Sequence, residues 1–349
     1  MGIADGPRAR GESGSRTSGI AVSTRVRLAR NLAGRRFTTH PDFSERADVL
    51  GEIRRAIQSL PEGRVFVWRD LEGESPLERR LLVERHLISR ELAEGEGPRA
   101  VAVNPEQALV IMVNEEDHLR IQCLLPGLAA HEAYGRVNRL DDLLSRQLTF
   151  AFDPGYGYLT SCPTNVGTGL RVSVMLHLPA LVMTRHIEKV FRAVYEMRMA
   201  VRGFYGEGTE ALGELYQISN QSTCGKGEED IIDDMEAAIA AIVHYEEKAR
   251  NKLAASERGQ LEDRVWRSWG LLRHARLMNS EEAMRHLSSL RLGLAMGVFG
   301  DLDPAELERL FLYSQPAHLQ RLEGRELEAG DRDAARAAFL RKSLGTRPG

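Results

Sequence analysis

The sequence ALVIMV-NEEDHLR occupies residues 108–120. Its six apolar residues form a short run rich in branched side chains, which is typical of a strand buried on both faces. Three carboxylates, an imidazole and a guanidinium follow within seven residues, and charged groups are rarely buried without a partner. We therefore expect the strand to end at a polar cavity, although an acidic cluster taken alone is more often a solvated turn.

The composition is that of a folded globular protein. Of the 349 residues 28% are charged and 42% are hydrophobic, and the formal net charge is −3, which argues against disorder and against binding of nucleic acid. No apolar run is long enough to cross a bilayer, so we expect no membrane association. Residues 1–19 are rich in Gly, Ser and Arg and lack the apolar segment of a signal peptide. We expect a disordered lead-in there and a cytoplasmic protein.

Three cysteines are present, Cys123, Cys162 and Cys224. They form no CxxC pair and no zinc spacing with the histidines, so they are predicted to be free thiols. Cys123 lies in an apolar run and is expected in the core.

Residues 22–28 alternate between two kinds of side chain. Val22, Thr24, Val26 and Leu28 share one side, whereas Ser23, Arg25 and Arg27 share the other, which is the period of a strand. Further strands are expected near 64–68, 99–104, 172–178, 198–202 and 215–220, and helices over 43–60, 76–89, 128–148, 179–197 and 228–253. Because these elements mix without a regular βαβ rhythm, we predict an α+β fold.

The pattern changes after residue 253. Segments 261–277, 281–296, 305–312 and 334–344 favour helices, and no strand is convincing there. The predicted organisation is therefore a lead-in at 1–19, a mixed domain at 20–253 and an all-helical domain at 254–349.

Several nucleotide and hydrolase motifs are absent. Gly225-Lys226 is not a P-loop because Asn220 and Gly227 replace required residues, and no GxGxxG, HExxH or GxSxG occurs. What remains is a set of arginines at strand ends or beside glycine-rich loops, namely Arg25, Arg27, Arg120, Arg171 and Arg202 with Gly167, Gly169, Gly203 and Gly206. Each is singly more often a surface residue, but guanidinium groups suit polyphosphate, and together they indicate a nucleotide-phosphate cradle.

Four motifs resemble the successive signatures of the phosphagen (guanidino) kinases. They are STRVR at 23–27, NEEDHLR at 114–120, CPTNVGTGLR at 162–171 and RGFYGE at 202–207. The helix carrying His86 and residues 159–181, 262–265 and 332–337 are similar to the bacterial protein-arginine kinase branch, which phosphorylates arginine side chains in proteins. The resemblance runs from about residue 20 to the C-terminus.

This resemblance implies an antiparallel sheet flanked by helices, with Mg²⁺ and ATP bound on the sheet. The residues implied at the nucleotide are Ser23, Thr24, Arg25, Val26, Arg27, His86, Arg120, Arg171, Val172, Ser173, Val174, Met175, Arg202, Gly203, Phe204, Tyr205, Gly206 and Glu207.

The resemblance also implies three catalytic residues, Glu116, Glu207 and Cys162. A guanidinium is protonated at neutral pH and is then a poor nucleophile, so a carboxylate must hold it and accept a proton. We assign the role of base to Glu116. Glu207 is expected to hold the guanidinium as a second carboxylate, and the Cys162 thiolate is expected to contact it as well. Magnesium is expected to be held by phosphates and water, with Glu115 contributing through water and no direct protein ligand.

The RDxxRA segment at 332–337 is by itself a charged helix start. Resemblance to the protein-arginine kinase branch implies that this segment forms a pocket for phosphoarginine. Binding of this product would then regulate the activity. The residues concerned are Arg332, Asp333, Ala334, Ala335, Arg336 and Ala337.

The predicted substrate follows from a difference between this sequence and the animal-type guanidino kinases. Animal-type guanidino kinases carry a helical domain before the first arginine strand, whereas only about twenty residues precede it here, which leaves an open mouth suited to a protein side chain. Two alternatives stay open: a kinase for free arginine or another small guanidine, and a phosphoarginine-binding adaptor with little catalysis. The resemblance further implies a homodimer that works with a Clp-type AAA+ protease and a stress-gene repressor, marking proteins for degradation.

Overall fold

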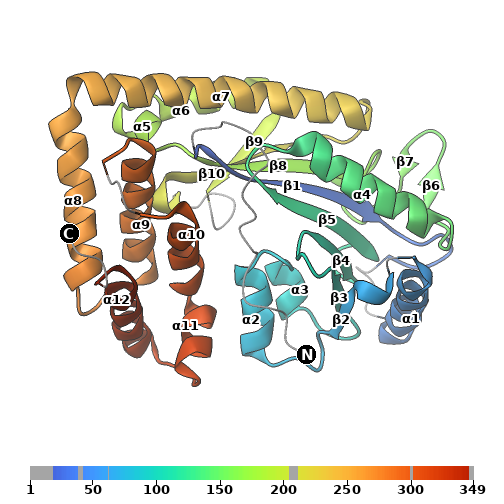
Figure 1. The fold of residues 1–349 in the computed structure, drawn as a ribbon. Helices are drawn as coiled ribbons and strands as arrows, with labels where there is room; N and C mark the ends of the chain where they lie inside the picture. The colour runs from blue at the N-terminus through green and yellow to red at the C-terminus, as the bar shows by residue number, and fades with distance from the viewer. Residues whose placement is uncertain (1–18, 38–41, 62, 204–210, 299–301, 346–349) are drawn as a thin grey trace.

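A central antiparallel sheet organises the molecule (Figure 1). The structure is a computed structural model that describes residues 19–37, 42–61, 63–203, 211–298 and 302–345. Its eight-stranded sheet has the order β2-β3-β4-β5-β1-β8-β10-β9. The strands are β1 (Ala21–Arg30), β2 (Val67–Asp70), β3 (Ala100–Val103), β4 (Leu109–Val113), β5 (Leu119–Pro126), β8 (Leu170–His177), β9 (Met199–Gly203) and β10 (Leu215–Asn220), with a separate hairpin of β6 (Phe152–Asp153) and β7 (Gly157–Tyr158).

Helices flank the sheet and then form a separate stack at one end. The first group is α1 (Phe43–Ser59), α2 (Pro76–Glu84), α3 (Arg90–Glu94), α4 (Ala130–Ser145), α5 (Pro179–Met183), α6 (Ile187–Glu196) and α7 (Glu228–Ser256). The C-terminal stack is α8 (Arg258–His274), α9 (Ser280–Ala295), α10 (Pro304–Tyr313), α11 (Pro316–Glu323) and α12 (Ala329–Gly345). Three short 3-10 turns lie at Gly63–Val65, Pro163–Asn165 and Leu212–Glu214. The predicted α+β class, with a helical C-terminal region, is confirmed.

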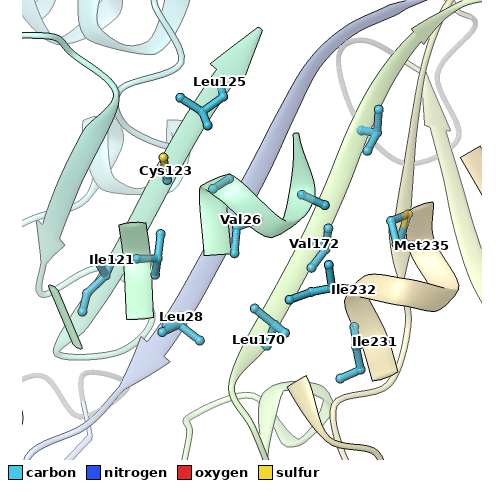
Figure 2. Packing of buried hydrophobic residues seen from close by; sticks show 14 of the residues in the cluster. Val26, Leu28, Ile121, Cys123, Leu125, Leu170, Val172, Ile231, Ile232 and Met235 are labelled. Carbon is cyan, nitrogen blue, oxygen red and sulfur yellow. The ribbon is translucent and has the colours of Figure 1, made fainter. Parts of the chain in front are cut away.

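The alternation in β1 gives the sheet two chemically different faces. Val26 and Leu28 point into a core formed with α4 and α7, whereas Arg25 and Arg27 occupy the alternate positions and lie on the other face. Figure 2 shows the apolar face, with β5, β1 and β8 side by side and α7 beside β8. Its labelled residues are Val26, Leu28, Ile121, Cys123, Leu125, Leu170, Val172, Ile231, Ile232 and Met235.

Among the residues that the structure describes, apolar side chains cover the two flanks of the polar face. At the β3–β4 end, Val101 and Met112 pack with Leu82 and Leu92 from α2 and α3. At the β8–β10 end, Met175 packs against a cluster formed by Leu215 and the C-terminal helices. The centre of the sheet, between these two clusters, is left to polar side chains.

The helix predicted over 76–89 is shorter than expected, and His86 does not lie on it. α2 begins at Pro76 behind Ser75, whose hydroxyl accepts a hydrogen bond from the Glu78 amide at 3.2 Å, and it ends at Glu84. The cause is His86, which has a φ of +58° and turns the chain out of the helix. Ser89 then caps the short helix α3, accepting from the Leu92 amide at 3.0 Å.

Other predicted elements need smaller corrections. The helix predicted over 179–197 is two helices, because Arg185 between them adopts a φ of +56°. The strand predicted at 64–68 begins later, since a 3-10 turn precedes β2. Helix α11 was not expected at all, although Pro316 stands at its first turn. Among the described residues no helix is long and apolar enough to span a membrane.

Leu28→Ala should test the importance of the apolar face. Leu28 is 1% exposed at the centre of the sheet, so removing its side chain should lower the free energy of unfolding by about 2–5 kcal/mol. Denaturant titration measures this, with Leu322→Ala as the control because Leu322 is 52% exposed. Equal stability of the two variants would contradict this account of the core.

Candidate active site

Arginines from several strands meet on the polar face of the sheet, which we call the arginine face (Arg25, Arg27, Arg120, Arg171 and Arg202). Arg27 lies directly opposite Arg171 of β8 on one side and Gln122 of β5 on the other. Residues paired in this way share a face and lie close together. Arg120 precedes Gln122 by two positions on β5, and Arg202 is paired with Gln217 of β10. The sheet register therefore gathers guanidinium groups that are far apart in sequence.

The charges on this face repel one another. Burial lowers the pKa of Arg25 to about 10, and it lowers the pKa of Arg27 well below its ordinary value, with the positive charges of Arg120, Arg25 and Arg171 adding to the effect. The Nε atoms of Arg25 and Arg27 are buried and have no hydrogen-bond acceptor among the described residues. Such a surplus of positively charged donors fits an anion with many oxygens, such as the triphosphate of ATP.

His86 stands at the edge of this face. Burial and the neighbouring charge of Arg25 lower the pKa of His86 to about 3, so its imidazole is neutral at physiological pH. Its backbone oxygen accepts a hydrogen bond from Nε2 of Gln122 at 2.9 Å. Gln122 was not predicted as a site residue, although its position two residues after Arg120 on a strand places it on the same face.

The acidic turn between β4 and β5 is closed by Asn114. This residue has a φ of +58°, which asparagine tolerates better than most residues, and its amide donates to the His118 oxygen at 3.0 Å. Its side-chain nitrogen donates to the oxygens of Arg46 and Pro98. These hydrogen bonds of Asn114 fix the turn to the segments around it.

Arg120 joins the acidic turn to the arginine face. Its Nη1 donates to Oε1 of Glu115 and its Nη2 to Oε2 of Glu116, both at 2.7 Å. The side chain of Glu115 is 2% exposed, whereas that of Glu116 is 41% exposed. Glu116 is therefore the carboxylate that a substrate can reach, while Glu115 is enclosed beside its arginine partner.

Asp117 connects the acidic turn to the loop that carries Cys162. Its buried Oδ1 accepts hydrogen bonds from Nδ2 of Asn31 and from the Ser161 amide, each at 2.7 Å. His118 is fixed as well, because its Nδ1 accepts from the Leu32 amide at 3.0 Å. Cys162, directly after Ser161, is half-buried and has its Sγ 3.0 Å from Oγ1 of Thr164. The predicted base and the predicted thiol are therefore positioned by one buried carboxylate.

Two glycines of the cysteine loop allow main chains to approach each other closely. Gly167 has a φ of +112°, and a Cβ there would lie 2.4 Å from the Thr223 oxygen. A Cβ on Gly169 would lie 2.7 Å from the Ala29 oxygen. Both glycines permit close approach of main chains, so they shape the loop that leads to Arg171.

Alternation also divides the predicted nucleotide-binding residues. Side chains of Thr24, Val26, Val172 and Val174 are buried on the side opposite the arginines, whereas those of Ser23, Arg25, Arg27, Arg171, Ser173 and Met175 occupy the arginine side. Gly203 is the last residue of β9. The predicted residues Phe204, Tyr205, Gly206 and Glu207 lie outside the residues that the structure describes.

The RDxxRA segment lies on α12, in the C-terminal stack. Arg332 donates from Nη1 to the Leu327 oxygen, and Asp333 accepts from Nη1 of Arg336 at 2.8 Å. Arg336 is 1% exposed, and its Nε donates to the Ser314 oxygen at 2.8 Å. Ala334 and Ala335 are half-buried and Ala337 is buried. In this structure the segment joins helices within the stack.

Comparison with known proteins agrees with this geometry. The family model "ATP:guanido phosphotransferase, C-terminal catalytic domain" matches residues 48–249, and "Protein-arginine kinase McsB C-terminal domain" matches residues 258–348. Protein-arginine kinases of Moorella thermoacetica and Halalkalibacterium halodurans are 47% and 45% identical, over 93% and 94% of this chain and 94% and 92% of theirs. The chain belongs to the protein-arginine kinase branch of the ATP:guanido phosphotransferases. It is therefore an enzyme that phosphorylates arginine side chains of proteins with ATP.

Solved phosphagen kinases share the fold. The duplicated taurocyamine kinase of Schistosoma mansoni, solved with bound transition-state analogue components, matches with a TM-score of 0.59 and 28% identity. That match covers 67% of this chain and 34% of the duplicated one. A lombricine kinase matches with a TM-score of 0.59 at 24% identity, over 66% of this chain and 67% of that one.

His86→Gln should flatten the pH dependence of stability. In the unfolded chain His86 takes up a proton below its ordinary pKa of 6.5, whereas the folded protein keeps it neutral down to about pH 3. This contribution to stability is complete above pH 6.5 and is lost as the pH falls toward 3. For a half-buried group we expect a contribution of roughly 0.5–1 kcal/mol per pH unit to the slope between pH 6 and 5, which the variant should lack.

Denaturant titration at several pH values measures this slope. The exposed His244 supplies the control, because His244→Gln should leave the wild-type slope unchanged. The same slope in His86→Gln as in the wild type would mean that His86 does not titrate as described.

Proposed function

We propose that the arginine face binds the triphosphate of Mg-ATP and that Glu116 is the base that activates the substrate arginine. The observation that carries this proposal is the position of Arg120. Its Nη2 donates to Oε2 of Glu116 at 2.7 Å, and the same guanidinium lies among the other arginines of the sheet. The group that binds phosphate and the group that accepts the proton are thereby neighbours. Phosphoryl transfer depends chiefly on such positioning and on neutralisation of charge.

The reaction forms a nitrogen–phosphorus bond and breaks the bond between the γ-phosphorus and the β–γ bridging oxygen. A nitrogen of the substrate guanidinium attacks the γ-phosphorus, ADP leaves with the bridging oxygen, and the proton of the attacking nitrogen passes to Glu116. The substrate guanidinium has a pKa above about 12, so this proton must be removed as the new bond forms. The arginine face stabilises the negative charge that spreads over the phosphate oxygens.

Cys162 and Glu207 complete the proposed guanidinium site. Asp117 fixes the backbone of Ser161, the residue before Cys162, and thereby aims the thiol loop toward the acidic turn. An anionic thiol there would hold the substrate guanidinium opposite Glu116. Glu207 is proposed as the second carboxylate clamp.

The proposed magnesium site consists mainly of nucleotide phosphates and water. In the described part of the chain no three His, Cys, Asp or Glu side chains gather in a way that could hold a metal. Magnesium commonly keeps several waters and binds through phosphates with one or two carboxylates. Glu115, adjacent to Glu116, remains the proposed contact through water. When bound, the ion would neutralise charge on the transferring phosphate.

Wider roles are proposed from family membership. We propose that the chain divides into a catalytic part at 20–253 and a helical part at 254–349. We also propose that Arg332, Asp333 and Arg336 bind phosphoarginine. The protein is further proposed to be a homodimer in the cytoplasm. The wider roles also include work with a Clp-type AAA+ protease and a stress-gene repressor.

The substrate class can be tested with labelled ATP. Incubation with Mg-ATP and either casein or free arginine should give acid-labile label on casein, since the substrate is an arginine side chain in a protein. Label on free arginine alone would support a small-guanidine kinase. Absence of label in both reactions, with tight binding of phosphoarginine, would support the adaptor.

Glu116→Gln should abolish transfer without loss of nucleotide binding. Removing a general base costs about 10²–10⁴ in rate, and the amide keeps the size of the side chain. We therefore expect kcat for casein to fall by at least about a hundredfold, with the Kd for Mg-ADP nearly unchanged. The exposed Glu106 provides the control variant Glu106→Gln, which should retain full activity. A Glu116→Gln enzyme with normal kcat would remove Glu116 from the mechanism.

A further inference from the structure

A junction between the C-terminal stack and the nucleotide side of the sheet lies between α2 and α11 (Figure 1). Both carboxylate oxygens of Glu84, the last residue of α2, are engaged there. Oε1 accepts from the Ala317 amide at 2.7 Å, and Oε2 accepts from the His318 amide at 3.0 Å and from Nδ1 of His318 at 2.6 Å. The side chain of Glu84 is 14% exposed, so these bonds are largely shielded from water.

Glu84 acts as the N-cap of a helix to which it does not belong. Gln315, the N-cap residue of α11, makes no side-chain capping bond, so the first amides of α11 depend on Glu84 from α2. A carboxylate at a helix N-terminus is favourable, whereas at the C-terminus of its own helix it is unfavourable. The position of Glu84 therefore favours the docked arrangement of the two helices over either helix alone.

The same end of α2 determines where His86 lies. The amide of His86 donates to the Val83 oxygen at 2.8 Å, and the amide of Leu87 donates to the Leu82 oxygen at 2.9 Å. This is the Schellman pattern that ends helices, with His86 at the left-handed position usually taken by glycine. A left-handed conformation is unfavourable for a non-glycine residue, so the neighbouring contacts hold His86 in it.

Contacts on both sides of His86 connect the stack to the arginine face. Before it, Nε of Arg85 donates to Nε2 of His318 at 3.3 Å. After the turn, Gln122 donates from Nε2 to the backbone oxygen of His86, and Gln122 is the direct neighbour of Arg27 across β5 and β1. A continuous set of contacts thus runs from α11 through the end of α2 to the proposed phosphate site.

The stack is also fastened on the opposite side of the arginine face. Glu214, just before β10, accepts hydrogen bonds from Nη2 of Arg264 and from Oγ of Ser288, both at 2.6 Å. The junction at Glu84 therefore closes a ring of elements around the face. If it opened, the stack would stay attached through Glu214 but would no longer support the end of α2.

We propose that Glu84 is a positioning residue for the nucleotide: by capping α11 it holds the end of α2, and with it His86, in the place required for ATP binding. Nucleotide affinity is then set partly by docking of the C-terminal stack. Because coupling between two sites is reciprocal, bound nucleotide also tightens the junction. This inference rests on the proposed placement of the nucleotide beside His86.

Titration calorimetry with Mg-ADP tests the proposal without any transfer step. Glu84→Ala should raise the Kd by about fivefold or more, a typical size for coupling between sites. Glu84→Gln should raise it less, since the amide retains one acceptor oxygen. The matched control is Glu78→Gln, because Glu78 pairs with Arg321 across the same two helices but at a more exposed position, and its Kd should stay within about twofold.

Two further measurements separate positioning from general destabilisation. In kinetics, Glu84→Ala should raise KM for ATP and leave KM for casein unchanged, whereas partial unfolding would lower the active fraction without changing either KM. In hydrogen exchange, Mg-ADP should slow the amides of Ala317 and His318 in the wild type but not in Glu84→Ala. A folded Glu84→Ala protein with wild-type Kd and wild-type KM for ATP would overturn the proposal.

His86→Ala distinguishes failure of the inference from failure of the nucleotide assignment. If His86→Ala weakens Mg-ADP binding and Glu84→Ala does not, the junction has no part in positioning. If His86→Ala has no effect on the Kd, the nucleotide does not lie beside His86, and the inference falls together with that assignment.

Discussion

Five guanidinium groups on one face of a β-sheet are the constraint on which the structure depends. Their mutual repulsion and their burial both oppose folding, as the lowered pKa values of Arg25 and Arg27 indicate. The opposing stabilisation comes from the other face of the same strands, where Val26 and Leu28 pack against α4 and α7. Strand alternation allows a single segment to carry both the functional charge and the core that supports it.

The parts of the fold that follow from local periodicity could be read from the sequence. The alternation of residues 22–28 correctly placed Arg25 and Arg27 away from the core, although Val22, at a bulge in β1, packs with the same cluster as Met175 on the other face. The apolar run before Asn114 is the buried strand β4. The motifs around Glu116 and Arg120 pointed to the proposed site, because the charged side chains and the strand that positions them are contiguous. The family, the enzyme class and the α+β architecture were predicted correctly for this reason.

Features that depend on long-range contacts could not be read in this way. A helical pattern continues past Glu84, but the left-handed turn at His86 is stabilised by Gln122 from a distant strand. Helix α11 lacks a capping signal of its own because its cap is Glu84 from another part of the chain. The burial of Arg336 also depends on partners far away in sequence, such as Met278 and Ser314.

If ATP binds to the arginine face as proposed, the buried Nε donors of Arg25 and Arg27 give it a second role, as a counterion for the folded chain. A ligand that binds the native state alone stabilises it by about 2.7 kcal/mol when present at a hundred times its Kd. The folded population would then rise and fall with the supply of nucleotide. A cell depleted of ATP would lose not only the phosphoryl donor but also part of the free energy that keeps its arginine kinase folded.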